Sequence, residues 1–172
     1  MSLELETRVV LIQHYKELAK TTSTGPWALA ALHNSERHVH GLRGRPLELD
    51  HLHDDERRVL LLFPQKGACA LSDAFRSDDP RPVTLIVPDG SWRQASRIPK
   101  RIAPLSRAQP VTLPPGPATR WGLRKETDPS RLATFEAIAR ALGYLESHTV
   151  RVELESSFER IVTATCQNRG HD

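Results

Sequence analysis

One carboxylate stands where an uninterrupted apolar run gives way to a small polar turn. Asp89 follows the run 82–87 and precedes the turn 90–92. A carboxylate in this position could act as a general base, cap the helix that follows, or bind a ribose. The residue type alone favours the cap, which is the commoner role of an Asp before a helix. Trp92 could stack on a base or cofactor ring or fill core, and core is the favoured interpretation for an isolated Trp.

A histidine-rich stretch is a second place where potential ligands gather. Two-residue spacing within a strand, such as that of His38 and His40, would put both rings on one face, as a zinc site could use. The stretch is polar and has no cysteine nearby, so a solvated hairpin is favoured and we expect no metal. The residues concerned are His33, His38, His40, His51, His53, Asp50, Asp54 and Asp55.

Several common chemistries have no signature in the chain. Lys66 and Gly67 lack the longer glycine pattern of a phosphate-binding loop, and no Gly-x-Gly-x-x-Gly is present. Serine and cysteine nucleophile signatures are also absent. The two cysteines, Cys69 and Cys166, are far apart in the sequence and indicate neither a disulfide framework nor a metal knuckle. These observations argue against the usual dehydrogenase and ATPase sites and against a disulfide framework.

The basic residues are unevenly distributed. The net charge is +3, but the segment 90–125 has eight basic residues and no acidic one. The rest of the chain carries 16 basic and 21 acidic residues. Such a segment is typical of a surface that binds a polyanion, and it is equally typical of a solvated face that pairs with the acidic half.

The elements that must position these residues follow an alternating plan. Continuous apolar runs predict strands, helical spacing predicts helices between them, and the sum is a single-domain α/β fold with a mainly parallel sheet and helices on both faces. Ligands of such sheets bind at the carboxyl ends of the strands, which selects the loops 64–67, 88–92 and 114–122. The predicted strands are 8–13, 58–63, 82–87 and 110–113. The predicted helices are 26–32, 91–100, 129–142 and 147–167, with a strand at 149–154 as the alternative to the start of the last.

Two boundaries of the third helix rest on end signals. Asp128 is expected to be its N-cap and Pro129 its first residue, and Gly143 is expected to stop it.

No secretory signal or membrane-spanning run is visible, so the chain is expected to be cytoplasmic.

Four blocks of sequence together resemble the DTW-domain family. The segment 89–95 (Asp-Gly-Ser-Trp-Arg-Gln-Ala) is similar to the family's Asp-x-Thr/Ser-Trp motif, which is followed by a basic residue and Gln-Ala. The family's N-terminal cysteine cluster is missing, Tyr15 stands where a Pro is commoner, and Ser91 replaces the motif Thr. The other similar blocks, within a match over about 9–142, are 14–17 with 24–25, 62–64, and 123–126 with 132–137.

This resemblance implies an activity on RNA. Such an enzyme transfers the 3-amino-3-carboxypropyl group of S-adenosylmethionine to N3 of a uridine in tRNA. It also implies kinship with the SPOUT class, with a C-terminal trefoil knot and, by analogy, a homodimer. The alternatives are a SPOUT-like RNA methyltransferase that uses S-adenosylmethionine, a non-catalytic RNA-binding module and, less favoured, a small-molecule transferase.

The resemblance also implies roles for individual residues. Asp89 would be the catalytic base that removes the uridine imide proton. S-adenosylmethionine would be held by the segments 63–68, 113–116 and 131–134, the last at a helix N-terminus, which suits its carboxylate. The cofactor-binding residues would be Phe63, Pro64, Gln65, Gly67, Pro88, Gly90, Ser91, Trp92, Leu113, Pro114, Leu132 and Thr134. The tRNA-binding residues would be Arg93, Arg97, Lys100, Arg101, Arg120 and Arg124.

Overall fold

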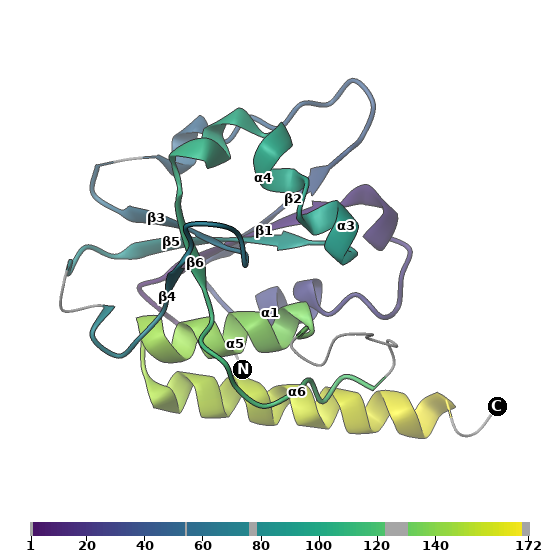
Figure 1. Cartoon of the computed structure of the whole chain (residues 1–172). Coiled ribbons are helices and arrows are strands. Elements are labelled where there is room, and N and C mark those ends of the chain that lie inside the picture. The colour runs from purple at the N-terminus through teal and green to yellow at the C-terminus, as the bar shows by residue number, and fades with distance from the viewer. Residues whose placement is uncertain (1, 54, 76–78, 123–130, 170–172) are drawn as a thin grey trace.

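A six-stranded sheet forms the middle layer of the computed structural model, which describes residues 2–53, 55–75, 79–122 and 131–169 (Figure 1). Neighbouring strands are all parallel, in the order β2-β1-β5-β3-β6-β4. The predicted α/β class with a parallel sheet is therefore confirmed. The strands are β1 (Arg8–His14), β2 (Ser35–His40), β3 (Arg58–Leu62), β4 (Cys69–Ala70), β5 (Val83–Asp89) and β6 (Gln109–Thr112).

The central strands are the apolar runs of the sequence. All four predicted runs form strands, because a strand covered on both faces needs apolar side chains at every position. In β5 all seven residues are buried. This strand continues two residues beyond the predicted run, since Pro88 and Asp89 still lie beside Ile12 and Gln13 of β1. Asp89 is thus the last residue of a central strand.

The histidine-rich stretch is not the hairpin that the sequence favoured. Its first part is β2, an edge strand that pairs in parallel with β1. Its second part includes the short 3-10 helix η2 (Asp50–Leu52), which leads towards β3. An edge strand needs little apolar sequence, because its side chains stay partly exposed. This explains why β2 carries no apolar run.

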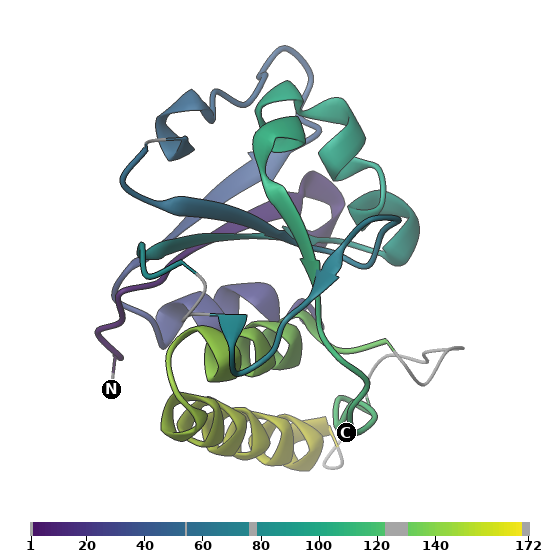
Figure 2. The ribbon, with the colours of Figure 1, turned by 60° about the vertical axis from the view of Figure 1, so that its left-hand side comes forward.

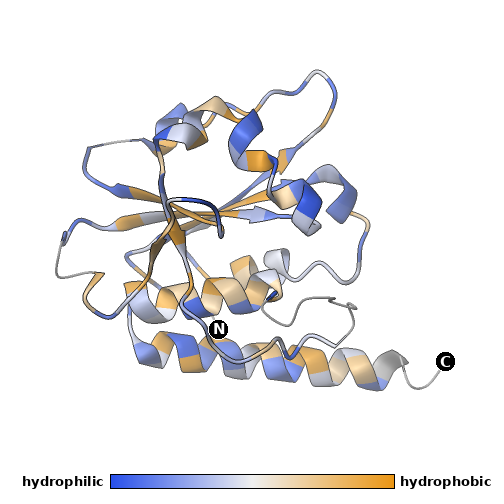
Figure 3. Ribbon diagram, in the orientation of Figure 1, coloured by the Kyte–Doolittle hydropathy of each residue, from blue (hydrophilic) through white to orange (hydrophobic). Residues whose placement is uncertain are grey.

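Helices pack on both faces of the sheet, as predicted (Figure 2). One face is covered by α1 (Gly25–Ala30) and α5 (Thr134–Leu145), and α6 (His148–Arg169) packs on the outer side of α5. Figure 3 shows mainly hydrophobic colouring along the central strands and mixed hydrophobic and hydrophilic colouring along α6. The other face is covered by α3 (Trp92–Ala95), α4 (Ile98–Arg101) and two 3-10 helices, η2 and η3 (Ala103–Arg107).

Two predicted helices differ in their boundaries. The single helix expected at 91–100 is two short helices, α3 and α4, with Pro99 in the first turn of the second. The helix expected from residue 129 begins at Thr134. Residues 131–133 are not helical, and Asp128 and Pro129 lie outside the described residues. The backbone N–H of Ala133 donates to the Glu136 carboxylate at 3.1 Å, which fixes the observed start.

Gly143 does not stop α5, which continues to Leu145. A Cβ at this position would lie 3.0 Å from Cβ of Arg151, so the glycine allows α6 to pack closely against α5. The predicted C-terminal helix is confirmed as α6, and the alternative strand at 149–154 is wrong. Leu154 and Phe158, four residues apart, are buried at helical spacing. No helix in the described ranges is both long and apolar enough to cross a bilayer.

Candidate active site

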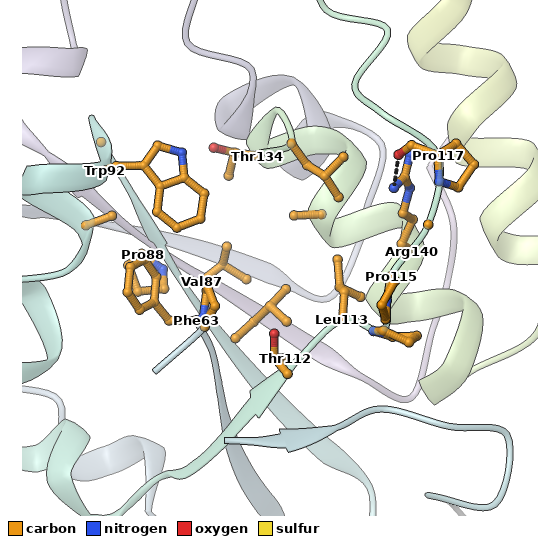
Figure 4. A pocket seen from close by; sticks show the side chains of 18 residues that line it. Phe63, Val87, Pro88, Trp92, Thr112, Leu113, Pro115, Pro117, Thr134 and Arg140 are labelled. Atoms are coloured by element: carbon orange, nitrogen blue, oxygen red, sulfur yellow. Dashed lines mark hydrogen bonds between the residues drawn. The ribbon is translucent and has the colours of Figure 1, made fainter. Parts of the chain in front are cut away.

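The three predicted ligand loops meet around a cavity of about 400 Å³ at the carboxyl ends of β3, β5 and β6 (Figure 4). The start of α5 closes another side, with Leu132 and Thr134. The walls are mainly apolar, which is typical of a small-molecule site. This cavity lies at the strand ends that topology selected, and ligand binding there stays a prediction.

Most of the residues predicted to hold a cofactor line this first cavity. They are Phe63, Pro64, Pro88, Gly90, Trp92, Leu113, Pro114, Leu132 and Thr134. Three predicted residues are not among those that line it: Gln65, Gly67 and Ser91. Ser91 caps α3, where its hydroxyl accepts from the Gln94 N–H while the Gln94 side chain accepts from the Ser91 N–H. Gly67 has a φ of +83°, so its role here is to make a turn.

Arg140 is a lining residue that the sequence analysis missed. It carries the charged side chain among the described residues that line the first cavity, and the residue is 9% exposed. Nη1 donates to the Pro117 carbonyl at 2.7 Å, and Nε lies 3.7 Å from the Glu155 carboxylate. Figure 4 shows it at the end of the cavity away from Trp92. Its position within α5, among apolar residues, gives no sequence signal of a binding role.

A second cavity of about 410 Å³ adjoins the first. Four residues line both cavities: Gly90, Trp92, Leu132 and Thr134. The second cavity is polar and basic, unlike the first. Its other lining residues are Lys20, Thr22, Thr24, Ser91, Arg93, Thr119, Trp121, Arg131 and Ala133.

Trp92 lines both cavities, so the core role that the sequence favoured is wrong, and stacking on a ligand stays a prediction. Its half-buried ring packs 5.5 Å from the Phe63 ring on one side, and the Arg131 guanidinium lies 5.1 Å from its centre. A ring in this position lines cavity surface and is not core.

Asp89 lies just behind the shared wall and is 2% exposed. Its Oδ2 accepts hydrogen bonds from Gln13 Nε2 and from the Ser23 hydroxyl, both at 3.1 Å. Its Oδ1 accepts from the Thr134 hydroxyl at 2.6 Å. Asp89 lines neither cavity, whereas Thr134 lines both. The carboxylate therefore reaches the site through the Thr134 hydroxyl.

Gly25 makes room for this carboxylate. A Cβ at residue 25 would lie 3.1 Å from Asp89 Oδ2 and 2.9 Å from a methyl carbon of Leu11. The start of α1 can approach the end of β5 only because residue 25 has no side chain. The Thr-Gly block seen in the sequence thus has a structural explanation.

A second buried carboxylate holds the far wall of the basic cavity. Glu136 is 3% exposed and accepts from the Arg120 N–H at 2.8 Å and from the Ala133 N–H at 3.1 Å. It also accepts from the Thr119 hydroxyl. These bonds tie the segment 119–121 to the first turn of α5, so that Trp121 lies against Trp27 and forms part of the cavity.

Of the predicted RNA-contacting residues that the structure describes, one lines the basic cavity. Arg93 lines the basic cavity, and Arg97, Lys100 and Arg101 are exposed on or next to α4. Arg120 is exposed but forms an ion pair with Glu159 of α6. Arg124 lies outside the described residues. Lys20 and Arg131, which line the basic cavity, were not among the predicted RNA-contacting residues.

Two histidines lie at the ends of β1 and β2 on the same side. Partial burial lowers the pKa of His14, and the neighbouring His40 lowers it further. Burial also lowers the pKa of His40, with a smaller contribution from Arg101. The rings are 6.2 Å apart, and the lowered pKa of each histidine favours its neutral form.

Comparison with known proteins gives consistent matches. The family model of the DTW domain matches residues 2–166. A Drosophila melanogaster protein named tRNA-uridine aminocarboxypropyltransferase 2 is 26% identical over 169 residues, which cover 95% of this chain and 64% of that protein. A Macaca fascicularis protein of the same name is 27% identical over 167 residues, covering 95% and 55%. The chain thus spans less than two thirds of the length of these relatives. No solved structure matches it significantly.

Proposed function

Because the chain belongs to the DTW domain family, we propose that it is a tRNA-uridine aminocarboxypropyltransferase that uses S-adenosylmethionine. The observation that carries this proposal is the pair of adjoining cavities, one apolar and one basic, which share a wall at Trp92 and Thr134. A group transfer between two bound molecules needs two such neighbouring sites. The names of the two relatives support the choice of reaction.

The apolar cavity suits the donor. Its apolar walls would contact the adenosine part, and Phe63, Trp92 and Leu113 are the residues best placed for this. Arg140 would hold the donor's carboxylate, because it is the charged side chain among the described residues that line this cavity. S-adenosylmethionine would supply a carbon that is already activated by its sulfonium. No metal is required for this chemistry.

The basic cavity suits the acceptor nucleotide. Lys20, Arg93 and Arg131 would attract its phosphates. Trp121 adds a buried indole N–H that has no hydrogen-bond partner among the described residues, and it could donate to a carbonyl of the base. Trp92 offers a ring on which the base can stack, beside the donor cavity. The uridine would then lie in the basic cavity, next to Trp92 and Thr134 of the shared wall.

Thr134 and Asp89 would remove the uridine imide proton together. The Thr134 hydroxyl accepts the proton from N3 while its own proton moves to Asp89 Oδ1, to which it is already hydrogen-bonded. N3 then forms a bond to the activated carbon, the carbon–sulfur bond breaks, and methylthioadenosine leaves. Gln13 and Ser23 hold the carboxylate for this step through its other oxygen. Asp89 thus acts as base through a hydroxyl relay.

The proposal also includes kinship with the SPOUT class and a cytoplasmic location. Kinship with the SPOUT class is supported by the all-parallel sheet and by the cavity at its carboxyl edge. The trefoil knot that this kinship implies would involve the chain after β6, part of which lies outside the described residues. A tRNA substrate is also what supports a cytoplasmic location.

The test is an incubation of the protein with S-adenosylmethionine and unmodified bulk tRNA, followed by mass spectrometry of nucleosides and coproducts. Aminocarboxypropyl-uridine together with methylthioadenosine is the expected result. Methyluridine with adenosylhomocysteine would instead identify a methyltransferase. Salt-sensitive tRNA binding without any cofactor binding would reduce the function to RNA binding.

A further inference from the structure

Three potential metal ligands lie together on the edge strand β2 and the 3-10 helix η2. Glu36 and His38 are two residues apart on β2, so their side chains lie on the same face of the sheet. His51 comes from η2 on that face. One ligand atom of each residue lies within 4.8 Å of the other two. The histidine-rich stretch therefore converges in space, although its sequence pattern led us to expect no metal.

The separations of these atoms are close to those of a zinc site. Glu36 Oε1 lies 3.5 Å from His38 Nε2 and 3.7 Å from His51 Nε2. Zinc binds imidazole nitrogen and carboxylate oxygen at about 2.0–2.2 Å, so two ligands of a tetrahedral ion are about 3.3–3.5 Å apart. Shifts of a few tenths of an ångström would bring the Glu36–His38 and Glu36–His51 pairs to that geometry.

Two of the three potential ligand atoms are buried polar atoms without a hydrogen bond to any described residue. They are Glu36 Oε1 and His38 Nε2. Buried polar atoms in native proteins are nearly always paired, so an orphan acceptor and an orphan ring nitrogen facing each other call for an explanation. A cation bound between them would satisfy both.

The surroundings hold the ligands in place. Arg8 donates to the second oxygen of Glu36 at 2.9 Å, which turns Oε1 toward the histidines. Leu49 and Leu52, both fully buried, anchor the chain on either side of His51. The His51 side chain is 48% exposed, so solvent can reach the site and occupy a fourth position.

We propose that Glu36, His38 and His51 bind a zinc-type divalent cation, with water as the fourth ligand, and that this cation joins the edge strand β2 to η2. Two imidazoles and a carboxylate are a ligand set that zinc uses, whereas calcium and magnesium prefer oxygen ligands alone. Glu36 and His38 pair with Val10 and Ile12, whose side chains pack beneath η2 and α4. The first cavity lies against the other face of the sheet. The metal site is thus independent of the transferase proposal.

The test is metal binding by the full chain after treatment with a chelator. Cobalt(II), which reports tetrahedral coordination by its visible absorption, is titrated first, and zinc is then measured by calorimetry. We expect one ion per chain. His51→Ala and His38→Ala should each weaken binding by more than the ~100-fold that loss of an outer-shell partner can cost, and Arg8→Ala by about 10–100-fold. His33→Ala, which changes an exposed histidine outside the cluster, should leave binding unchanged.

Two results would overturn the proposal. One is the absence of a tetrahedral cobalt spectrum at any cobalt concentration up to the millimolar range. The other is binding that His51→Ala and His38→Ala leave as strong as in the parent chain. Circular dichroism of each variant shows whether it is folded, and the half-exposed His51 is the ligand least needed for packing.

Discussion

The Thr134 hydroxyl donates a 2.6 Å hydrogen bond to Oδ1 of Asp89, so the first residue of α5 is joined to the last residue of β5. We predict that Thr134→Val, which removes the hydroxyl but keeps the shape, lowers kcat by about 10²–10⁴-fold, the usual worth of general acid–base catalysis. Thr134→Ser should retain most of the activity. Binding of S-adenosylmethionine by calorimetry should change little in either variant. Equal activity of Thr134→Val and the parent chain would contradict the relay.

Asp89→Asn tests the other end of the same relay. We expect the transfer rate to fall by at least the same factor as in Thr134→Val, about 10²–10⁴-fold, because an amide cannot take up the proton. The double variant with Thr134→Val should be no slower than the slower single variant, since residues that act as one unit are not additive. Single-turnover rates with saturating donor measure this. If Asp89→Asn binds the donor normally and keeps the full rate, Asp89 is not the base.

Basic side chains of the second cavity should contribute to tRNA binding. We predict that Arg93→Ala and Arg131→Ala each weaken tRNA binding and reduce the salt dependence of the binding constant by about one unit of slope, as expected for loss of one phosphate contact. Binding at several salt concentrations checks this. Arg81→Ala is the matched control, because Arg81 is exposed near the start of β5, at the opposite end of that strand. If Arg81→Ala weakens tRNA binding as much as Arg93→Ala does, the positive charges attract tRNA without a defined site.

Gly25→Ala should disturb both the fold and the site. The added methyl would lie within 3.1 Å of the Asp89 carboxylate and of Leu11, both of which are buried. Overpacking of this kind costs about 1–3 kcal/mol of the free energy of unfolding. Urea denaturation measures the loss. Gly122→Ala serves as control, because no heavy atom lies within 4 Å of its added Cβ. Similar losses in both variants would argue against crowding at residue 25.

The sequence predicted the parts of the fold that depend on local composition. Apolar runs such as 82–87 form central strands because both of their faces are covered. The edge strand β2 was missed for the converse reason, since its Ser-Glu-Arg-His-Val-His sequence stays half exposed. The start of α5 was misplaced because Pro129 and Asp128 resemble helix-start signals, whereas the observed start depends on the Glu136 side chain.

The candidate site also has features that could be predicted from the sequence and features that could not. The cavity at the carboxyl ends of the strands follows from topology, and nine of the twelve predicted cofactor residues line it. The partners of Asp89 could not be predicted, because Gln13, Ser23 and Thr134 come from three segments that only the folded chain brings together. Arg140 was missed for a similar reason, since its contacts with Pro117 and Glu155 depend on tertiary structure.

The wall shared by the two cavities has a thermodynamic consequence. Leu132 and Thr134 line both cavities, so a ligand that orders these residues in one of them changes the surface offered by the other. By linkage, the factor by which a bound donor alters affinity for RNA must equal the factor by which bound RNA alters affinity for the donor. If the donor and RNA bind as proposed, a wall built from the same side chains would therefore make the two binding steps a single coupled equilibrium.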